Sequence, residues 1–196
     1  MNKSRLEAFS DGVIAIIITI MVLEMKVPHG ADWADLHKLW PVFASYVLSF
    51  VFVGIYWANH HHLVHLLKRV TARVMWANLH LLFWLSLIPF VTAWMGENHF
   101  AQNPVALYGA VTFMSGVAYT LLVGAIRRAN GELHLLGDKP TLFHKGNYSL
   151  VMYATSIAAA YWHTGISFAI FVAVAVMWFI PDKRIEKIVS ESSSKK

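Results

Sequence analysis

Residues 5–23 read RLEAFSDGVIAIIITIMVL, and they contain an uninterrupted apolar run from Gly12 to Leu23. A membrane-spanning helix needs about 20 mostly apolar residues, so we expect a span over about 6–25 that carries Asp11 near one end. A carboxylate inside a span costs about 2.5–3.5 kcal/mol on insertion scales and normally faces a partner within the protein. The first span is therefore expected to be an inner helix of an assembly, shielded from lipid. Alternatively, Asp11 lies in the headgroup zone and extends toward water.

The composition of the whole chain is that of a membrane protein. Of its 196 residues 57% are hydrophobic and 14% are charged, with a mean hydropathy of +0.52. Soluble domains carry about 25% charged residues, and a core of this size could not bury so much apolar surface. The absence of cysteine excludes disulfides, thiolate catalysis and cysteine-based zinc sites. The net charge of +5 is spread between apolar runs, which does not favour nucleic-acid binding.

Six apolar stretches could each cross a bilayer: about 6–25, 41–66, 74–95, 104–126, 147–162 and 165–180. The last two form one stretch from Tyr148 to Ile180, which as a single helix of about 33 residues would be about 50 Å long. We therefore expect a turn at His163-Thr164-Gly165. The fold class is an all-α integral membrane protein with six transmembrane helices, one domain over 1–181 and a cytoplasmic tail over 182–196.

The distribution of basic residues predicts that both termini are cytoplasmic. Only Lys26 and Lys38 fall in the outer segments of this arrangement. Because cytoplasmic loops are enriched in lysine and arginine, the count favours six spans over five. No convincing cleavage site follows the first apolar run, so we expect an uncleaved span. The basic residues expected inside are Lys3, Arg5, Lys68, Arg69, Arg73, Arg127, Arg128, Lys139, Lys145, Lys183, Arg184, Lys187, Lys195 and Lys196.

Three polar residues fall at a similar depth in the first three spans. At 1.5 Å per residue, Asp11, His60 and Asn78 each lie about 8–12 Å from the inner face. A carboxylate, an imidazole and an amide at one depth can form a satisfied polar layer. Such a layer could fix the register of the helices or relay protons, and the sequence leaves both roles open.

The run Asn59-His60-His61-His62, with His65, raises the question of a metal site. His61 and His65 are four residues apart, which is a spacing that can bind zinc. No HExxH motif is present, and no carboxylate lies nearby in the sequence. We expect His60 to face inward and His61, His62 and His65 to lie at the inner membrane interface.

Several functional motifs are missing from the sequence. It has no TVGYG-type filter, no nucleotide-binding loop, no nucleophile elbow and no arginine ladder on any span. Together with the composition, this predicts that the protein is not an enzyme and binds neither nucleotides nor nucleic acid. Pro89, in Ile88-Pro89-Phe90, predicts a kink in the third span.

The pattern R-x-x-x-F-S-D from Arg5 to Asp11 resembles the signature of the transmembrane-protein-175 family, the lysosomal and bacterial potassium channels that lack a P-loop filter. The resemblance extends by motif over about residues 3–90, and by span number and size over the rest. The further stretches that are similar to this family are 12–20, 23–28, 56–60, 78–79 and 88–90.

The resemblance implies a potassium-favouring homotetramer in the inner membrane of a prokaryote, with the first spans of four subunits lining one central pore. Its apolar constriction would be formed by Ile16, Ile20 and Leu23, with Thr19 beside them; the spacing i, i+4, i+7 puts these three on one helix face. It implies no cofactor and no bound metal, potassium being transient in the pore, and no partner besides lipid and further copies of the chain. The residues implied to form a structural and gating network are Arg5, Phe9, Ser10, Asp11, His60 and Asn78.

Three other functions remain open at the level of sequence. A proton-coupled or proton-conducting transporter would use Asp11 and His60 as titrating groups. A membrane-embedded metal enzyme would use His60 to His65, and a structural subunit would carry no flux. The channel is the favoured interpretation of the sequence.

Overall fold

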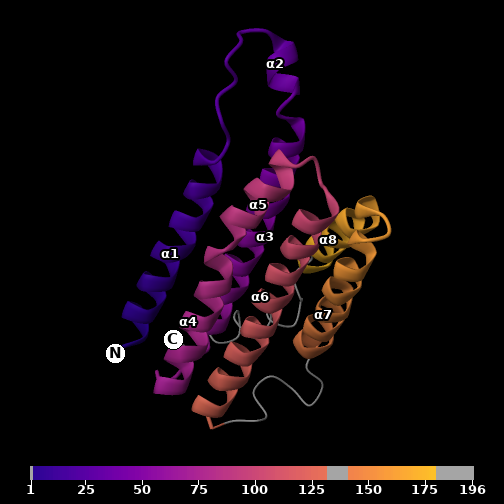
Figure 1. The fold of residues 1–196 in the computed structure, drawn as a ribbon. Helices are drawn as coiled ribbons and strands as arrows, with labels where there is room; N and C mark the ends of the chain where they lie inside the picture. The colour runs from indigo at the N-terminus through magenta and orange to yellow at the C-terminus, as the bar shows by residue number, and fades with distance from the viewer. Residues whose placement is uncertain (1, 132–140, 180–196) are drawn as a thin grey trace.

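The computed structural model describes residues 2–131 and 141–179, with the side chains of 141–144 left aside, and every regular element in these ranges is a helix. The tail predicted over 182–196 lies outside the described residues. Figure 1 shows the helices as an upright bundle with the short α2 at one end of it. The helices are α1 (Lys3–Leu23), α2 (Trp33–His37), α3 (Trp40–His65), α4 (Ala72–Ser86), α5 (Ile88–Glu97), α6 (Gln102–Ala129), α7 (Thr141–Ala160) and α8 (Thr164–Phe179).

Local sequence signals set the helix starts. The Asn2 side chain accepts a hydrogen bond from the Arg5 backbone N–H at 3.0 Å, and Thr71 caps α4 in the same way. Such caps satisfy backbone donors that have no partner within the helix. Pro41 lies in the first turn of α3, where its missing N–H costs nothing.

The third expected span is divided at Leu87 into α4 and α5. Pro89 lies in the first turn of α5 and cannot donate a backbone hydrogen bond to the carbonyl of Leu85. The kink predicted at this proline is therefore a break between two helices. Residues 72–97 are still long and apolar enough, taken together, to cross a membrane.

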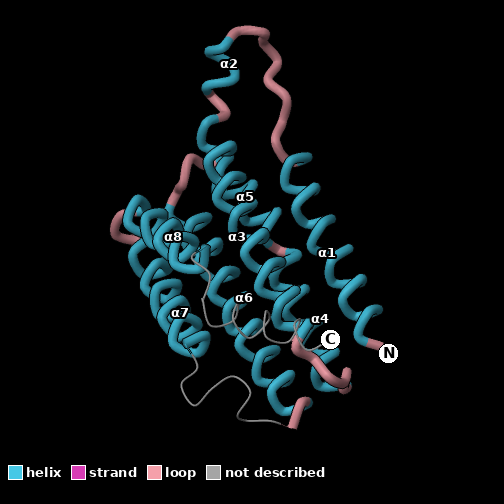
Figure 2. Tube along the Cα trace, turned by 180° about the vertical axis from the view of Figure 1, so that it is seen from behind, coloured by secondary structure: helices cyan, strands magenta, loops and turns pink. Residues whose placement is uncertain are grey.

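α6 is the central helix of the described bundle, and it packs against α4, α5, α7 and α8. Small residues allow the close approach of α7, because a Cβ on Gly109 would lie 3.0 Å from Ile157 and 3.1 Å from the Ser156 hydroxyl. The Ser167 hydroxyl donates to the Ser156 carbonyl at 2.7 Å and joins α8 to α7. Figure 2 shows α7 and α8 together on one side of α6.

α1 lies at the edge of the bundle and packs against α3, α4 and α5 (Figure 1). α7 and α8 lie on the opposite side of the molecule (Figures 1 and 2). One face of α1 is therefore left uncovered by the chain itself, which makes this helix different from the central α6.

Each of the six apolar stretches is mainly helical in the described residues. That these helices cross a bilayer stays a prediction. Four segments, 3–23, 40–65, 72–97 and 102–129, have the length and hydropathy of a span. The chain turns between α7 and α8 at residues 161–163, next to the expected turn. α8 has 16 residues and is a shorter apolar helix, about 24 Å long at 1.5 Å per residue.

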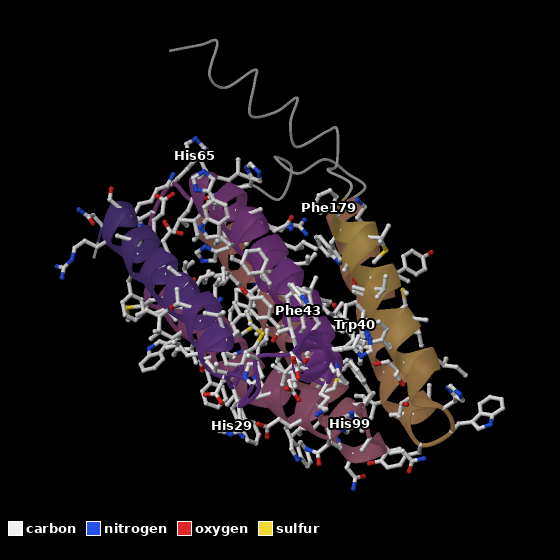
Figure 3. The ribbon with its side chains drawn as sticks, turned by 90° about the horizontal axis from the view of Figure 1, so that it is seen from above. His29, Trp40, Phe43, His65, His99 and Phe179 are labelled. Carbon is white, nitrogen blue, oxygen red and sulfur yellow. The ribbon has the colours of Figure 1, made fainter. Side chains whose placement is uncertain are left out.

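A wide apolar groove of about 490 Å³ separates α3 from α8. Trp40, Phe43 and Phe179 line it, and Figure 3 shows Trp40 and Phe43 near α8. The groove lies on the side of α3 that contacts α8, away from α1. It contains almost no polar surface, which suits a surface that faces lipid tails.

Gly96 provides a test of the close packing of α5 on α3. A Cβ there would lie 2.7 Å from the Val42 Cα and 2.5 Å from the Ser45 hydroxyl, and the backbone cannot move aside easily. We expect Gly96→Ala to lower the free energy of unfolding by about 1–3 kcal/mol, measured in detergent by denaturant titration.

The matched control for this test is Gly54→Ala, because a Cβ on Gly54 meets nothing within 4 Å. Replacing a helical glycine with alanine at an open position stabilises by about 0.5–1 kcal/mol. Equal effects of the two substitutions would contradict the packing described for α5.

Candidate functional site

The two sides of α1 differ in burial. Ile16, Ile20 and Leu23 are 57%, 39% and 79% exposed, and the Thr19 side chain is exposed beside them. These four residues are called the α1 stripe; two of them, Ile16 and Ile20, also line an open groove of about 420 Å³ whose other wall includes Pro89 and Phe90 of α5. The opposite side of the helix packs against α3, α4 and α5, and its buried residues are Leu6, Ser10, Ile14, Ile17 and Met21.

A buried hydrogen-bond chain holds this opposite side in place. Asn78 of α4 donates from Nδ2 to the Ser10 hydroxyl at 2.9 Å, and its Oδ1 lies 2.7 Å from Nε2 of His60 on α3. All three side chains are 0% exposed. The Ser10–Asn78–His60 triad thus joins α1, α4 and α3 through side chains that have no contact with solvent.

The directions of the hydrogen bonds in the triad follow from Ser10. Its hydroxyl donates to the Leu6 carbonyl at 2.8 Å, so it accepts from Asn78. The Oδ1 of Asn78 is then left as an acceptor, and His60 must donate from Nε2. The other ring nitrogen of His60, Nδ1, is buried without a hydrogen-bond partner in the described chain.

A ladder of polar contacts runs beside the triad where the antiparallel α1 and α3 meet. The Lys3 Nζ donates to the His65 carbonyl at 2.5 Å, Glu7 lies 3.3 Å from the His61 ring, and the Trp57 indole N–H donates to Asp11 at 3.1 Å. The members are four residues apart on each helix, which is the spacing of neighbours on one helix face.

The polar layer predicted from depth contains one wrong member. His60 and Asn78 do meet, but Ser10 rather than Asp11 is the residue of α1 that joins them. Successive residues on a helix are about 100° apart. Asp11 is consequently turned toward Trp57, where it is half-buried.

Two other members of the predicted network lie apart from the triad. Phe9 is 53% exposed, and the Arg5 side chain is exposed at the start of α1. Phe9 precedes Ile16 by seven residues, which is two helical turns, so it extends the α1 stripe instead. Phe9 is thus exposed whereas Ser10 is buried, and its predicted role in gating stays a prediction.

The histidine run is arranged as the sequence indicated. His60 is buried, whereas His61, His62 and His65 are exposed at the end of α3. Within the described ranges, no three histidine or carboxylate side chains are grouped in a way that could hold a metal ion.

A second buried polar cluster was not expected from the sequence. Thr92 of α5 donates to the Ser49 hydroxyl at 2.7 Å, and Ser49 lies 3.0 Å from the Tyr108 hydroxyl of α6. This cluster joins α3, α5 and α6 in the half of the molecule that is predicted to be outer. Only one indication of this cluster is present in the sequence, namely single serine and threonine residues inside apolar runs. Such residues commonly hydrogen-bond to the backbone of their own helix, so they do not predict contacts between helices.

Acidic groups remain unpaired at the end of α1 that is predicted to face outward. Lys26 pairs with Glu97 at 2.6 Å, and this contact raises the pKa of Lys26. Lys38 pairs with Asp35 at 2.8 Å. Both lysines of this side are thus neutralised, while Glu24 and Asp32 have no ion pair in the described chain. The local charge favours cations.

Comparison of this chain with known proteins shows which family and which proteins it resembles. Residues 5–89 match the family model described as endosomal/lysosomal potassium channel TMEM175. The chain is 52% identical to a protein named potassium channel from Chryseobacterium sp. (strain P1-3), over 98% of this chain and 100% of that one.

A solved structure and a more distant relative extend the comparison. The crystal structure of a lysosomal potassium-selective channel TMEM175 homolog from Chamaesiphon minutus matches with a TM-score of 0.78 and 25% identity, over 90% of this chain and 95% of that chain. The human protein named endosomal/lysosomal proton channel TMEM175 is 32% identical over 53% of this chain, which corresponds to 23% of the human protein.

Asn78→Ala tests whether the triad holds α1 to the bundle. The substitution leaves the His60 Nε2–H without an acceptor and removes one of the two hydrogen bonds of the Ser10 hydroxyl, and a buried unsatisfied group costs about 1–3 kcal/mol. We expect a clearly lower melting temperature in detergent. Asn98→Ala is the control, because Asn98 is exposed and bonds only the Trp94 carbonyl of its own helix end. Equal melting temperatures for the two variants would show that the triad is dispensable.

Proposed function

The chain belongs to the TMEM175 family, and from this membership we propose that it forms a potassium-favouring cation channel. The channel is a homotetramer in the inner membrane of a prokaryote. The α1 helices of four subunits line a single pore, and the α1 stripe forms its apolar constriction. The bilayer and further copies of the chain are its partners.

One observation carries this proposal: the α1 stripe is apolar, exposed and held in one orientation. The triad attaches the other side of α1 to α3 and α4, so Ile16 and Leu23 stay exposed at the surface of their own subunit. In a membrane protein such a face needs a cover of lipid or of protein. The unpaired Glu24 beside Leu23 supports a cation pathway there.

The mechanism follows from the chemistry of the stripe. A narrow ring of isoleucine and leucine side chains excludes ions by dewetting, and opening widens it enough for a partly hydrated cation. Potassium loses part of its hydration at lower cost than sodium because it is the larger ion. Discrimination by such a ring is weaker than by a filter of carbonyl oxygens.

Thr19 contributes a polar oxygen beside the constriction. Its hydroxyl hydrogen bonds back to its own helix, since the oxygen lies 2.9 Å from the Ile16 carbonyl and 3.2 Å from the Ala15 carbonyl. The lone pairs of the exposed hydroxyl oxygen are then free to face a passing cation. The triad and Asp11 act on structure and gating, away from the ions.

Phe9 extends the apolar lining toward the cytoplasmic mouth. It is 53% exposed and shares a helix face with Ile16 and Leu23 at intervals of seven residues. Its neighbours Ser10 and Asp11 are both bonded to other helices, so Phe9 cannot turn inward without breaking these contacts.

Flux through liposomes containing purified protein tests the constriction. We expect fast flux that favours potassium over sodium, and we expect Ile20→Asn to reduce this preference by at least several-fold because the amide hydrates the ring. Val151→Asn on α7 is the control, since Val151 is 65% exposed on a helix far from α1 in the bundle. Slow flux that needs a proton gradient and ignores Ile20→Asn would favour a transporter based on Asp11 and His60.

Single cysteines test the orientation of Phe9, because the natural chain contains none. We expect a charged methanethiosulfonate reagent, applied from the cytoplasmic side, to change the current of Phe9→Cys within seconds. Ser10→Cys, one residue along and 0% exposed, is expected to stay unmodified. Intact potassium current in Phe9→Cys that does not respond to the reagent would place Phe9 outside the pore.

A further inference from the structure

A small cavity of about 40 Å³ lies between α3, α6, α7 and α8, on the far side of α3 from the α1 stripe. Tyr56 and Asn59 contribute to its wall from α3, Gly116 and Thr120 from α6, and Tyr153 from α7. None of the residues that line it is charged. The cavity is therefore a separate feature of the fold, with its own chemistry.

Two tyrosine hydroxyls at this cavity have no hydrogen-bond partner in the described part of the chain. Tyr153 is 2% exposed, and Tyr56 packs between the rings of Phe52 and Tyr119. By contrast, the Tyr119 hydroxyl donates to the Asn59 carbonyl at 3.3 Å. The buried side-chain polar atoms that lack a partner in the described chain do not include these hydroxyls, so both keep surface that a water-sized molecule can reach, and their hydrogen-bonding capacity is available to it.

Other polar atoms of the wall can accept a hydrogen bond. The Asn59 Nδ2 donates to the Ile55 carbonyl at 2.8 Å, which leaves its Oδ1 as an acceptor. The Thr120 hydroxyl donates to the Gly116 carbonyl at 2.9 Å and keeps its oxygen lone pairs. The wall thus offers two donors and two acceptors to a small polar molecule.

Glycines keep this space open. A Cβ on Gly116 would lie 3.0 Å from Leu150 Cδ2 and 3.9 Å from the Tyr56 hydroxyl oxygen. A Cβ on Gly146 would lie 3.8 Å from the Thr120 hydroxyl. A methyl group at residue 116 would therefore extend toward the polar part of the cavity.

We propose that this cavity is a water-binding site, at which one or two ordered water molecules bridge the hydroxyls of Tyr56 and Tyr153. A water molecule needs at least about 10–15 Å³ of space open to its centre, and two to four polar partners inside a protein. A lipid chain would leave both hydroxyls unpaired, and an ion would lack a counter-charge. The site makes the packing of α7 and α8 on α3 depend on water, independently of conduction through the pore.

X-ray radiolytic footprinting of the full-length protein in detergent tests the proposal, because radicals formed from a bound water oxidise the side chains that contact it. We expect Tyr56 and Tyr153 to be oxidised several-fold faster than Tyr108. Tyr108 is the matched control, since it is 0% exposed, lies outside this cavity and is hydrogen-bonded to Ser49. Protection of all three tyrosines to the same extent would overturn the proposal, and it is the result expected if a lipid chain fills the cavity.

Gly116→Ala serves as a displacement variant in the same experiment. Its methyl group enters the site, so oxidation of Tyr56 and Tyr153 is expected to fall toward the rate of Tyr108. Gly124→Ala on the same helix is the control, because a Cβ there meets nothing within 4 Å. If Tyr56 and Tyr153 are oxidised at the same rate in Gly116→Ala as in Gly124→Ala, the water that gives rise to the oxidation lies elsewhere.

Discussion

The hydrogen bonds of Asn78 fix the rotation of α1 about its own axis, and the proposed pore depends on that rotation. Asn78 binds Ser10 on one side and His60 on the other, and all three side chains are buried. Exchange of these bonds for others would require turning α1, which would also separate Asp11 from Trp57. A helix at the edge of the bundle is thereby held in its orientation by buried hydrogen bonds.

As a consequence of this orientation, the two sides of α1 have different compositions and different roles. The anchored side carries Ser10, whereas the exposed side from Phe9 to Leu23 is apolar except for Thr19. Asp11 has no ion pair but accepts a hydrogen bond from Trp57, whereas Glu24, where the stripe ends, and Asp32 in the following loop have neither an ion pair nor a side-chain hydrogen bond among the residues described. The remaining helices provide support, with α6 in the middle and the α7–α8 pair packed against it on the side away from α1.

The sequence predicted the helical class, an interruption at Pro89 (expected as a kink and found as a break) and the inward orientation of His60, since these follow from composition, backbone chemistry and burial. The sequence-based prediction grouped Asp11, in place of Ser10, with His60 and Asn78. The depth of a residue in the membrane can be estimated from its position along the helix to within a turn. The direction in which its side chain points, however, changes by about 100° with each residue. Ser49 and Tyr56 could not be assigned, because their environments depend on which helices pack together, and only the fold determines that.

The structure of the assembled protein in lipid nanodiscs, determined by electron cryomicroscopy in potassium, tests the central claim most directly. We expect four α1 helices around one axis, with Ile16 and Leu23 facing that axis and the Ser10–Asn78–His60 hydrogen bonds intact in each subunit. An assembly in which the α1 stripe faces lipid, or in which α1 is rotated so that Ser10 leaves Asn78, would contradict it.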